Sequence, residues 1–194
     1  ISGESEWFEL YVRALWKGES TLECVSLIGK LTNIHLARLE TERLRVQANT
    51  DALTGLYNRK ALMEMSQAPA EYYDEYRALF FVDVDNFKTI NDVFGHEYGD
   101  EVLRQIAQGL RSVFRKTDAV GRIGGDEFVI LWSGSYKQRD LEQKARAICT
   151  LFQAEEYKLK DGQTIGLSVG VACMDDDSVD FQTLLSQADK ALYY

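Results

Sequence analysis

The stretch Ala119-Val-Gly-Arg-Ile-Gly-Gly-Asp-Glu-Phe-Val-Ile-Leu-Trp132 decides the fold of this chain. Two short apolar runs flank Gly124 and Gly125, which is typical of a β-hairpin, because glycine takes a positive φ without steric cost. Asp126 and Glu127 follow the turn, and successive side chains of a strand point to opposite faces. A turn without side chains lets a ligand approach the backbone, so the pattern favours a place for a cation and a phosphate. A surface hairpin with solvated acids is the alternative interpretation.

A second predicted strand also ends in acids. Residues 78–85, Ala-Leu-Phe-Phe-Val-Asp-Val-Asp, form a continuous apolar run of strand length, as in a strand that is buried on both faces. Its two carboxylates, Asp83 and Asp85, lie two residues apart and therefore share one face of the strand.

The other elements alternate between helix and strand patterns. We predict a loop at 53–59, helices at 60–67 and 86–94, a loop at 95–99, helices at 100–115 and 138–152, a strand at 163–172 and a helix at 179–194. The order αβααββαβα contains no internal repeat and fits a central antiparallel sheet with helices packed on one face.

The first 49 residues carry two helical patterns. Apolar residues recur at helical spacing within residues 1–18, and Gly18 suits a C-terminal cap. Ser20-Thr-Leu-Glu23 has the spacing of a capping box and predicts a second helix to about Ala48. The thin apolar seam in the second half of this helix favours coiled-coil pairing, and a helix packed on its own domain is the alternative.

Composition limits the class of protein. With 194 residues, 45% of them hydrophobic, the chain can form one domain with a core plus an appendage. A net charge of −9 argues against a nonspecific nucleic-acid or membrane-surface binder, so we expect no nucleic-acid partner and no membrane contact in this stretch. The three cysteines lack metal spacing and suit a reducing compartment, which favours the cytoplasm. No signal peptide and no apolar run of ~20 residues is visible. Because Ile1 is not a natural initiator, we expect a longer protein with room for a sensor or membrane region.

Four motifs occur in order at fitting spacings: residues 51–59 (Asp-Ala-Leu-Thr-Gly-Leu-Tyr-Asn-Arg), 81–92 (Phe-Val-Asp-Val-Asp-Asn-Phe-Lys-Thr-Ile-Asn-Asp), 95–100 (Gly-His-Glu-Tyr-Gly-Asp) and 122–128 (Arg-Ile-Gly-Gly-Asp-Glu-Phe). Taken together, they resemble the GGDEF family of diguanylate cyclases over about residues 50–194. The resemblance implies an α+β domain, similar to the palm of nucleotide polymerases and adenylyl cyclases, with a central mostly antiparallel sheet surrounded by helices. Residues 1–49 would precede it as a helical, coiled-coil signalling segment at the end of a longer sensor region.

The family joins two GTP molecules into cyclic di-GMP and releases two pyrophosphates. The resemblance assigns the metal site to the carboxylates of Asp83 and Asp126 and the carbonyl of Val84. It implies two Mg²⁺ ions per active site, with Mn²⁺ as an alternative, and hard oxygen ligands suit these ions. Asp126 and Glu127 share metal binding and base duty, and their partition stays open. We expect Asp85 to cap the helix that follows.

The resemblance also places the nucleotide. Asn91 and Asp100 match the guanine-contacting positions, since a carboxylate accepts from the guanine N1–H and 2-amino group. Lys88 matches a phosphate-contacting position, with a solvated lysine as the alternative. His96 is a substrate candidate or a structural loop histidine. The glycine pair of the turn contributes its backbone to substrate binding.

Two arginines also lie within the matching motifs. Arg59 and Arg122 are expected to hold loops by ion pairs. The last helix of the family usually continues with a Lys and an Arg that reach the triphosphate, whereas this sequence ends at Tyr194.

A product-inhibition site is a further implication. Arg115-Lys-Thr-Asp118 has the spacing of the family's RxxD motif before the glycine turn. Arg115 offers a planar fork of donors for a phosphate or a guanine edge, and Asp118 can accept from guanine N1–H. Arg146 is a candidate second arm from a neighbouring domain. A surface ion pair that caps a helix is the alternative.

The sequence leaves three functions open. The first is an active diguanylate cyclase that works as a homodimer, with GTP as substrate and cyclic di-GMP as product and inhibitor. The second is a noncatalytic GGDEF module that binds GTP or cyclic di-GMP as a sensor. The third is another nucleotidyl cyclase on a similar fold, and Asn91 and Asp100 argue against an adenine substrate.

Overall fold

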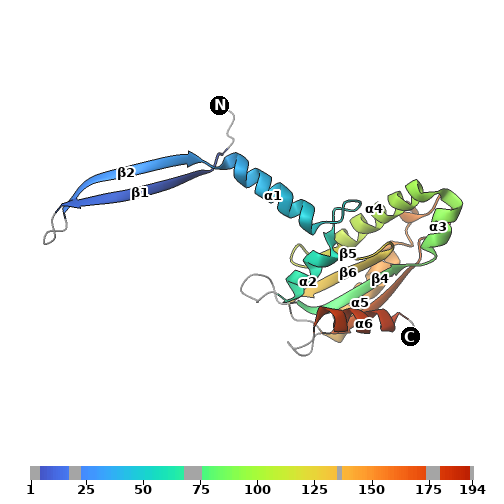
Figure 1. Cartoon of the computed structure of the whole chain (residues 1–194). Coiled ribbons are helices and arrows are strands. Elements are labelled where there is room, and N and C mark those ends of the chain that lie inside the picture. Colours follow the sequence, from blue (N-terminus) through green and yellow to red (C-terminus); the bar gives the residue numbers. More distant parts are fainter. Residues whose placement is uncertain (1–4, 18–22, 68–75, 135–136, 174–179, 193–194) are drawn as a thin grey trace. The chain divides into compact units, whose positions relative to one another are not determined.

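A computed structural model describes residues 5–17, 23–67, 76–134, 137–173 and 180–192 (Figure 1). The chain divides into two compact units, residues 1–48 and residues 49–194. The first unit contains β1 (Phe8–Lys17), β2 (Glu23–Asn33) and nearly all of α1 (His35–Asn49). Among the described residues, no helix has both the length and the apolar composition needed to cross a membrane.

The helices predicted over residues 1–18 and 20–48 are wrong for most of this unit. β1 and β2 form an antiparallel two-stranded sheet, and only the last part of the stretch, α1, is helical. Phe8, Leu10 and Val12 recur at every second position, which is the period of a strand, while their neighbours also satisfy helical spacing. Short apolar runs of this kind do not separate helix from strand. Most of the expected capping box lies outside the described residues.

The second unit is built on a five-stranded sheet with the order β3-β5-β6-β4-β7. Its strands are β3 (Tyr57–Asn58), β4 (Tyr76–Val84), β5 (Ala119–Arg122), β6 (Glu127–Ser133) and β7 (Leu167–Cys173). Every neighbouring pair is antiparallel except β3 and β5, so the predicted mostly antiparallel sheet is confirmed. The two-residue strand β3 lies within the predicted loop at 53–59, and it is too short to leave an alternating pattern in the sequence.

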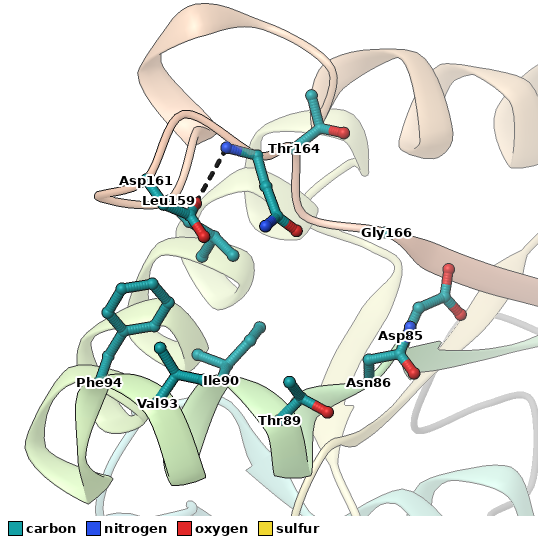
Figure 2. Close-up of a pocket in the computed structure, with 11 residues that line it drawn as sticks. Asp85, Asn86, Thr89, Ile90, Val93, Phe94, Leu159, Asp161, Thr164 and Gly166 are labelled. Atoms are coloured by element: carbon teal, nitrogen blue, oxygen red, sulfur yellow. Dashed lines mark hydrogen bonds between the residues drawn. The ribbon is translucent and has the colours of Figure 1, made fainter.

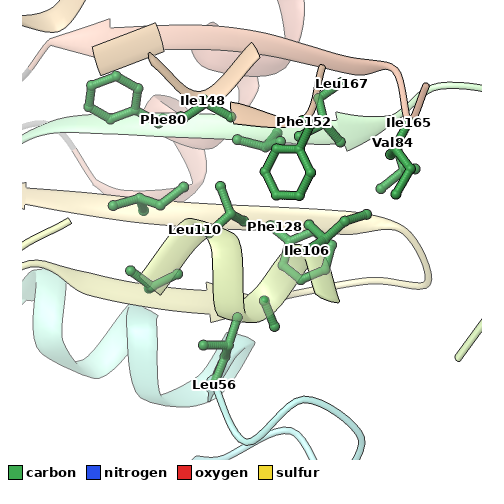
Figure 3. Close-up of a cluster of buried hydrophobic side chains, with 14 of the residues drawn as sticks. Leu56, Phe80, Val84, Ile106, Leu110, Phe128, Ile148, Phe152, Ile165 and Leu167 are labelled. Carbon is green, nitrogen blue, oxygen red and sulfur yellow. The ribbon is translucent and has the colours of Figure 1, made fainter. Parts of the chain in front are cut away.

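Helices cover both faces of this sheet, so the prediction that they pack on one face is wrong. They are α2 (Arg59–Gln67), α3 (Phe87–Phe94), α4 (His96–Val113), α5 (Gln138–Leu151) and α6 (Phe181–Ala191), with a short 3₁₀ turn at Glu155–Tyr157. One hydrophobic cluster joins the sheet to α3, α4 and α5, and a second joins it to α2 and α6. Along β4, Phe80 and Val82 belong to the first cluster, and Leu79 and Phe81 to the second. Figure 3 shows Phe80 and Ile106 within the first cluster.

The helix α4 begins earlier than the sequence predicts. Its first residue is His96, which lies within the predicted loop at 95–99. Gly95 has a φ of 87° and does separate α3 from α4. Gly99, which also suggests a loop, lies inside α4 for a different reason: a Cβ there would lie 1.9 Å from Oδ1 of Asn91. Gly99 therefore allows the first turn of α4 to pack closely against α3.

Candidate active site

The acids of the two central strands meet at one end of the sheet. Asp83 of β4 and Glu127 of β6 are directly opposite in the antiparallel register. Opposite residues of such a pair have their Cβ atoms roughly 4.5–5.5 Å apart on the same face. The backbone N–H of Val84 donates to the carbonyl oxygen of Asp126 at 3.3 Å, which ties the end of β4 to the residue before β6. Positions 43 residues apart in sequence, Asp83 and Asp126, are thus brought together as expected.

The hairpin between β5 and β6 is confirmed, but its glycines serve a different purpose from the one predicted. Neither Gly124 nor Gly125 has a positive φ. A Cβ on Gly124 would lie 2.2 Å from Oε2 of Glu127, so this glycine makes room for the carboxylate. A Cβ on Gly125 would meet nothing within 4 Å, which leaves the turn backbone open to a ligand.

Crowding of acids changes the protonation of Asp83. Its pKa rises from the ordinary 3.8 to about 6, first because of burial and then because of Asp126, Glu127, Asp85 and Asp189. Like charges that share a site disfavour ionisation, and a cation bound between them would relieve that repulsion. Together with the meeting of acids from β4 and β6, the raised pKa of Asp83 makes this end of the sheet the candidate functional site.

The chemistry of the donors fits a magnesium site. Among the described residues, no three His, Cys, Asp or Glu side chains are grouped so closely that they could hold a metal ion by themselves. Mg²⁺ keeps several of its waters and needs only one or two protein carboxylates, in addition to oxygens of the substrate. Asp83, Asp126 and the carbonyl of Val84, the ligands expected from the sequence, are oxygen donors of the kind that Mg²⁺ prefers. The raised pKa of Asp83 and this small number of protein ligands are therefore both compatible with a Mg²⁺ site.

Arg122 links the glycine turn to Asp51, the first residue of the motif at 51–59. Nε and Nη2 of Arg122 donate to the carbonyl oxygen of Gly125 at 3.1 and 2.7 Å, and Nη1 pairs with Asp51 at 3.1 Å. Burial pushes the pKa of Asp51 upward, but hydrogen bonds from Thr54 and Arg122 outweigh it and hold the pKa below its usual range. The expected ion pair of Arg122 is confirmed. Arg59 instead donates a hydrogen bond to Oε1 of Gln182 at 3.1 Å.

The residues matched to guanine recognition lie where α3 meets α4. The side-chain oxygen of Asn91 approaches Gly99 so closely that no Cβ fits between them, and Asp100 is the next residue of α4. Asn91 and Asp100 are both half-buried. Lys88 and His96 are exposed, on α3 and at the first position of α4 respectively.

Asp85 does not cap α3 as expected. The N-cap position is Asn86, which has a φ of 55° and makes no side-chain capping hydrogen bond. Asp85 instead accepts a hydrogen bond at its Oδ1 from Oγ of Ser168 at 2.7 Å. Its side chain therefore links the end of β4 to β7, and its charge adds to the acid cluster.

The predicted product-inhibition residues lie at the other end of α4. The carboxylate of Asp118 is 2% exposed, and it accepts from the backbone N–H of Arg115 at 2.8 Å and from the N–H and Oγ of Ser133 at 3.0 Å. Arg115 follows the end of α4, and its guanidinium lies 5.9 Å from the centre of the Trp132 ring. Arg146 is exposed on α5.

Sequence reasoning missed two charged residues near these sites. Asp189 on α6 contributes to the raised pKa of Asp83. Lys144 on α5 donates to the carbonyl oxygen of Val113 and lies over the Phe114 ring, close to Arg115. Neither has a sequence signal, because helix packing rather than local spacing brings each to its site.

Comparison with known proteins shows the family of this chain. Residues 48–194 match the family profile described as diguanylate cyclase, GGDEF domain. The chain is 34% identical over 177 residues to the cyclic di-GMP phosphodiesterase PdeR of Escherichia coli, covering 87% of this chain and 26% of that protein. It is 37% identical over 164 residues to the diguanylate cyclase TpbB of Pseudomonas aeruginosa, covering 81% of this chain and 38% of that protein.

A solved structure extends the comparison to the fold. The crystal structure of the coiled coil and GGDEF domain of DgcB from Caulobacter crescentus, in complex with c-di-GMP, matches with a TM-score of 0.68 and 28% identity, covering 82% of this chain and 86% of that chain. The chain spans between 26% and 41% of the length of the curated relatives that it matches. Because the family profile covers residues 48–194, the chain belongs to the GGDEF diguanylate cyclase family.

Proposed function

We propose that residues 50–194 form an active diguanylate cyclase domain, which condenses two GTP molecules into cyclic di-GMP and releases two pyrophosphates. The observation that carries this proposal is the pairing of Asp83 with Glu127 beside Asp126, where the pKa of Asp83 rises to about 6. Each 3′-hydroxyl must attack the α-phosphate of the other GTP, so the site must gather negative charge around a cation.

In this proposal Asp83, Asp126 and the Val84 carbonyl hold Mg²⁺ or Mn²⁺, two ions per active site. The bound ions would neutralise the triphosphate and lower the pKa of the attacking hydroxyl. Asp126 and Glu127 carry the catalytic acid–base duty. The open turn at Gly124 and Gly125 offers backbone N–H groups to the triphosphate, because nothing blocks the approach to Gly125.

In this proposal Asn91 and Asp100 recognise guanine, Lys88 contacts a phosphate, and His96 lies at the edge of the substrate site.

Replacing Asp100 with alanine should raise the KM for GTP about 10- to 100-fold, because a guanine donor pair loses its charged acceptor. Initial rates over a range of GTP concentrations measure this. Glu97→Ala, which removes an exposed acid from the same turn of α4, is the control and should leave the KM unchanged. Equal affinity of the unmodified chain for ATP and GTP would contradict the assignment.

The product needs two GTP molecules and one domain holds one, so two copies must face each other across a two-fold axis. We propose that the chain works as a homodimer and that α1 pairs with its counterpart as a coiled coil. α1 has no buried residue, and Leu36, Leu39, Leu44 and Val46 are exposed on it. The two-stranded sheet before it then belongs to the end of an upstream signalling region. Since GTP is the substrate, we place the domain in the cytoplasm, with no nucleic-acid partner.

Product inhibition is proposed at Arg115, Asp118 and Arg146. The carboxylate of Asp118 already accepts hydrogen bonds from the backbone N–H groups of Arg115 and Ser133. We therefore assign it the role of holding the backbone of Arg115, whose guanidinium binds cyclic di-GMP. Arg115→Ala should keep turnover and lose inhibition by added cyclic di-GMP, which is noncompetitive with GTP in the unmodified chain. Product-inhibition curves measure this, with Arg111→Ala on the last turn of α4 as the matched control. Unchanged inhibition in Arg115→Ala would show that residues 115–118 only end the helix and do not bind the product.

A second candidate is a noncatalytic module that senses GTP or cyclic di-GMP. It is favoured by the relative PdeR, whose name describes a cyclic di-GMP phosphodiesterase and of which this chain covers 26%. The deciding experiment incubates the chain with GTP and Mg²⁺ over a range of protein concentrations and identifies the product by mass spectrometry. Cyclic di-GMP formed with a specific activity that rises with protein concentration supports the cyclase. Nucleotide binding without turnover at any concentration would support the sensor.

A further inference from the structure

A cavity of about 260 Å³ lies between α3 and the loop over residues 159–166 (Figure 2). Thr89, Ile90 and Val93 of α3 form one wall, and residues of the loop form the other. These positions recur at helical spacing on one side of α3, whereas Asn91 packs against α4. The cavity is therefore separate from the proposed guanine site.

The charged groups that line this cavity are all acidic. Asp85 and Asp161 are its only charged lining residues in the described part of the chain. Oδ1 of Asp85 accepts from Oγ of Ser168 at 2.7 Å, and Oδ1 of Asp161 accepts from the N–H of Gln163 at 3.0 Å. Lys160 is not among the residues that line the cavity, and its Nζ lies 4.4 Å from the centre of the Tyr98 ring.

The cavity also has an apolar side. Ile90, Phe94 and Leu159 line it, and Ile90 and Leu159 are buried beneath it. Val93 stands at this wall with 65% of its surface exposed. Among the described residues of the second unit, no other large hydrophobic side chain is exposed to this degree. A pocket with an apolar lining and a few convergent polar groups is typical of a small-molecule site.

We propose that this cavity binds a small organic cation, in which a guanidinium, amidinium or ammonium group is attached to a short apolar body. The cationic group would donate to the carboxylates of Asp85 and Asp161, with the hydroxyls of Thr89 and Thr164 as further partners, and the body would cover Val93. Pockets for drug-sized ligands measure roughly 300–1,000 Å³, so this smaller cavity suits a smaller molecule.

The test uses benzamidine, which carries a planar cation on an apolar ring, and benzamide, its neutral counterpart of nearly the same shape. Each is titrated into the whole chain while backbone amide signals are followed by two-dimensional NMR. Benzamidine should give saturable shifts at Thr89 and Gln163, on the two walls, with a millimolar dissociation constant; benzamide should bind at least about tenfold more weakly. No saturable shift at these walls, or equal binding of the two probes, would overturn the proposal.

Variants locate the site without touching the proposed catalytic residues. Asp161→Asn keeps an acceptor for the Gln163 N–H but removes the charge, and should weaken benzamidine binding about fivefold or more. Val93→Thr keeps the side-chain shape and should weaken it about twofold. Asp92→Asn, the same change at an exposed acid of α3 that does not line the cavity, is the matched control and should bind like the unmodified chain. Unchanged binding by Asp161→Asn, with an unperturbed amide spectrum elsewhere, would refute the assignment.

Discussion

Replacing Asp83 with asparagine should reduce cyclic di-GMP formation by at least about 100-fold and, at about pH 7.5, make the domain more stable. Activity falls because an amide replaces a charged metal ligand. Stability rises because Asp83 lies opposite Glu127, where burial and then the neighbouring acids raise its pKa to about 6. Solvent still reaches this carboxylate, so screening limits the gain in unfolding free energy to about 1 kcal/mol.

The gain in stability from Asp83→Asn should grow as the pH rises. In the folded state the pKa of Asp83 lies above its ordinary value of 3.8, so the folded chain binds this proton more tightly than the unfolded chain does. The stabilising contribution of the protonated group is complete below about pH 4 and is lost as the pH rises through about 6. The amide of the variant does not titrate, so the two proteins should differ most above pH 6 and least near pH 4.

Urea denaturation at several pH values measures this difference, with Asp92→Asn as the control for loss of one exposed acid from the same region. Mg²⁺ provides a readout that does not depend on turnover. Added Mg²⁺ should raise the Tm of the unmodified chain, because it binds the folded state only, and should have little effect on the Asp83→Asn variant. Near-normal product formation by the variant, or a lower stability at pH 7.5, would contradict the role of Asp83.

The fold of the second unit could be predicted because its signals are local and strong. The apolar run that ends at Asp83 and the runs around Gly124 are long enough, and different enough from helical periodicity, to identify the central strands. The closeness of Asp83 and Asp126 was expected only from the family resemblance, because no local pattern says which strands are neighbours, and the register that pairs Asp83 with Glu127 comes from the structure.

The first unit shows where such reasoning fails. β1 and β2 have apolar residues at positions that fit a strand and a helix equally well, and the chain offers no turn signal strong enough to decide. Apolar residues such as Leu10, Leu27 and Leu31 remain exposed on these strands, at 63%, 67% and 63%. When a strand has no core to pack against, its apolar residues need not lie on one face. Their spacing then says less about whether the segment is a strand or a helix.

Glycines are the other source of error. The sequence predicts a loop that ends at Gly99 and a turn with positive φ at Gly124 and Gly125, but neither Gly99 nor Gly124 has a positive φ. Each instead leaves space for the tip of a side chain, that of Asn91 and that of Glu127 respectively. This requirement follows from tertiary packing, so a single sequence does not reveal it, and it explains why two glycines lie beside the predicted substrate and acid residues.

The same reasoning gives the largest expected effect on stability, at Gly170 of β7. A Cβ there would lie 2.0 Å from the carbonyl oxygen of Ala188 and 3.2 Å from the backbone nitrogen of Leu192. These are backbone atoms of α6 and of the residue that ends it, so no side-chain rotation can relieve the overlap. α6 would have to move away from the sheet, although Phe181 and Leu184 are buried against it with at most 1% exposed.

Gly170→Ala should therefore lower the free energy of unfolding by about 2–3 kcal/mol, the range expected when extra atoms are forced into a packed core. Gly125→Ala is the matched control for stability, because its Cβ would meet nothing within 4 Å and its φ is not positive. Urea denaturation of the three proteins compares the glycines directly, and equal stability of the two variants would show that α6 adjusts freely. Asp189 of α6 is the smallest of the causes that raise the pKa of Asp83, so a displaced helix should change that pKa little, and the effect of Gly170→Ala should be seen in stability.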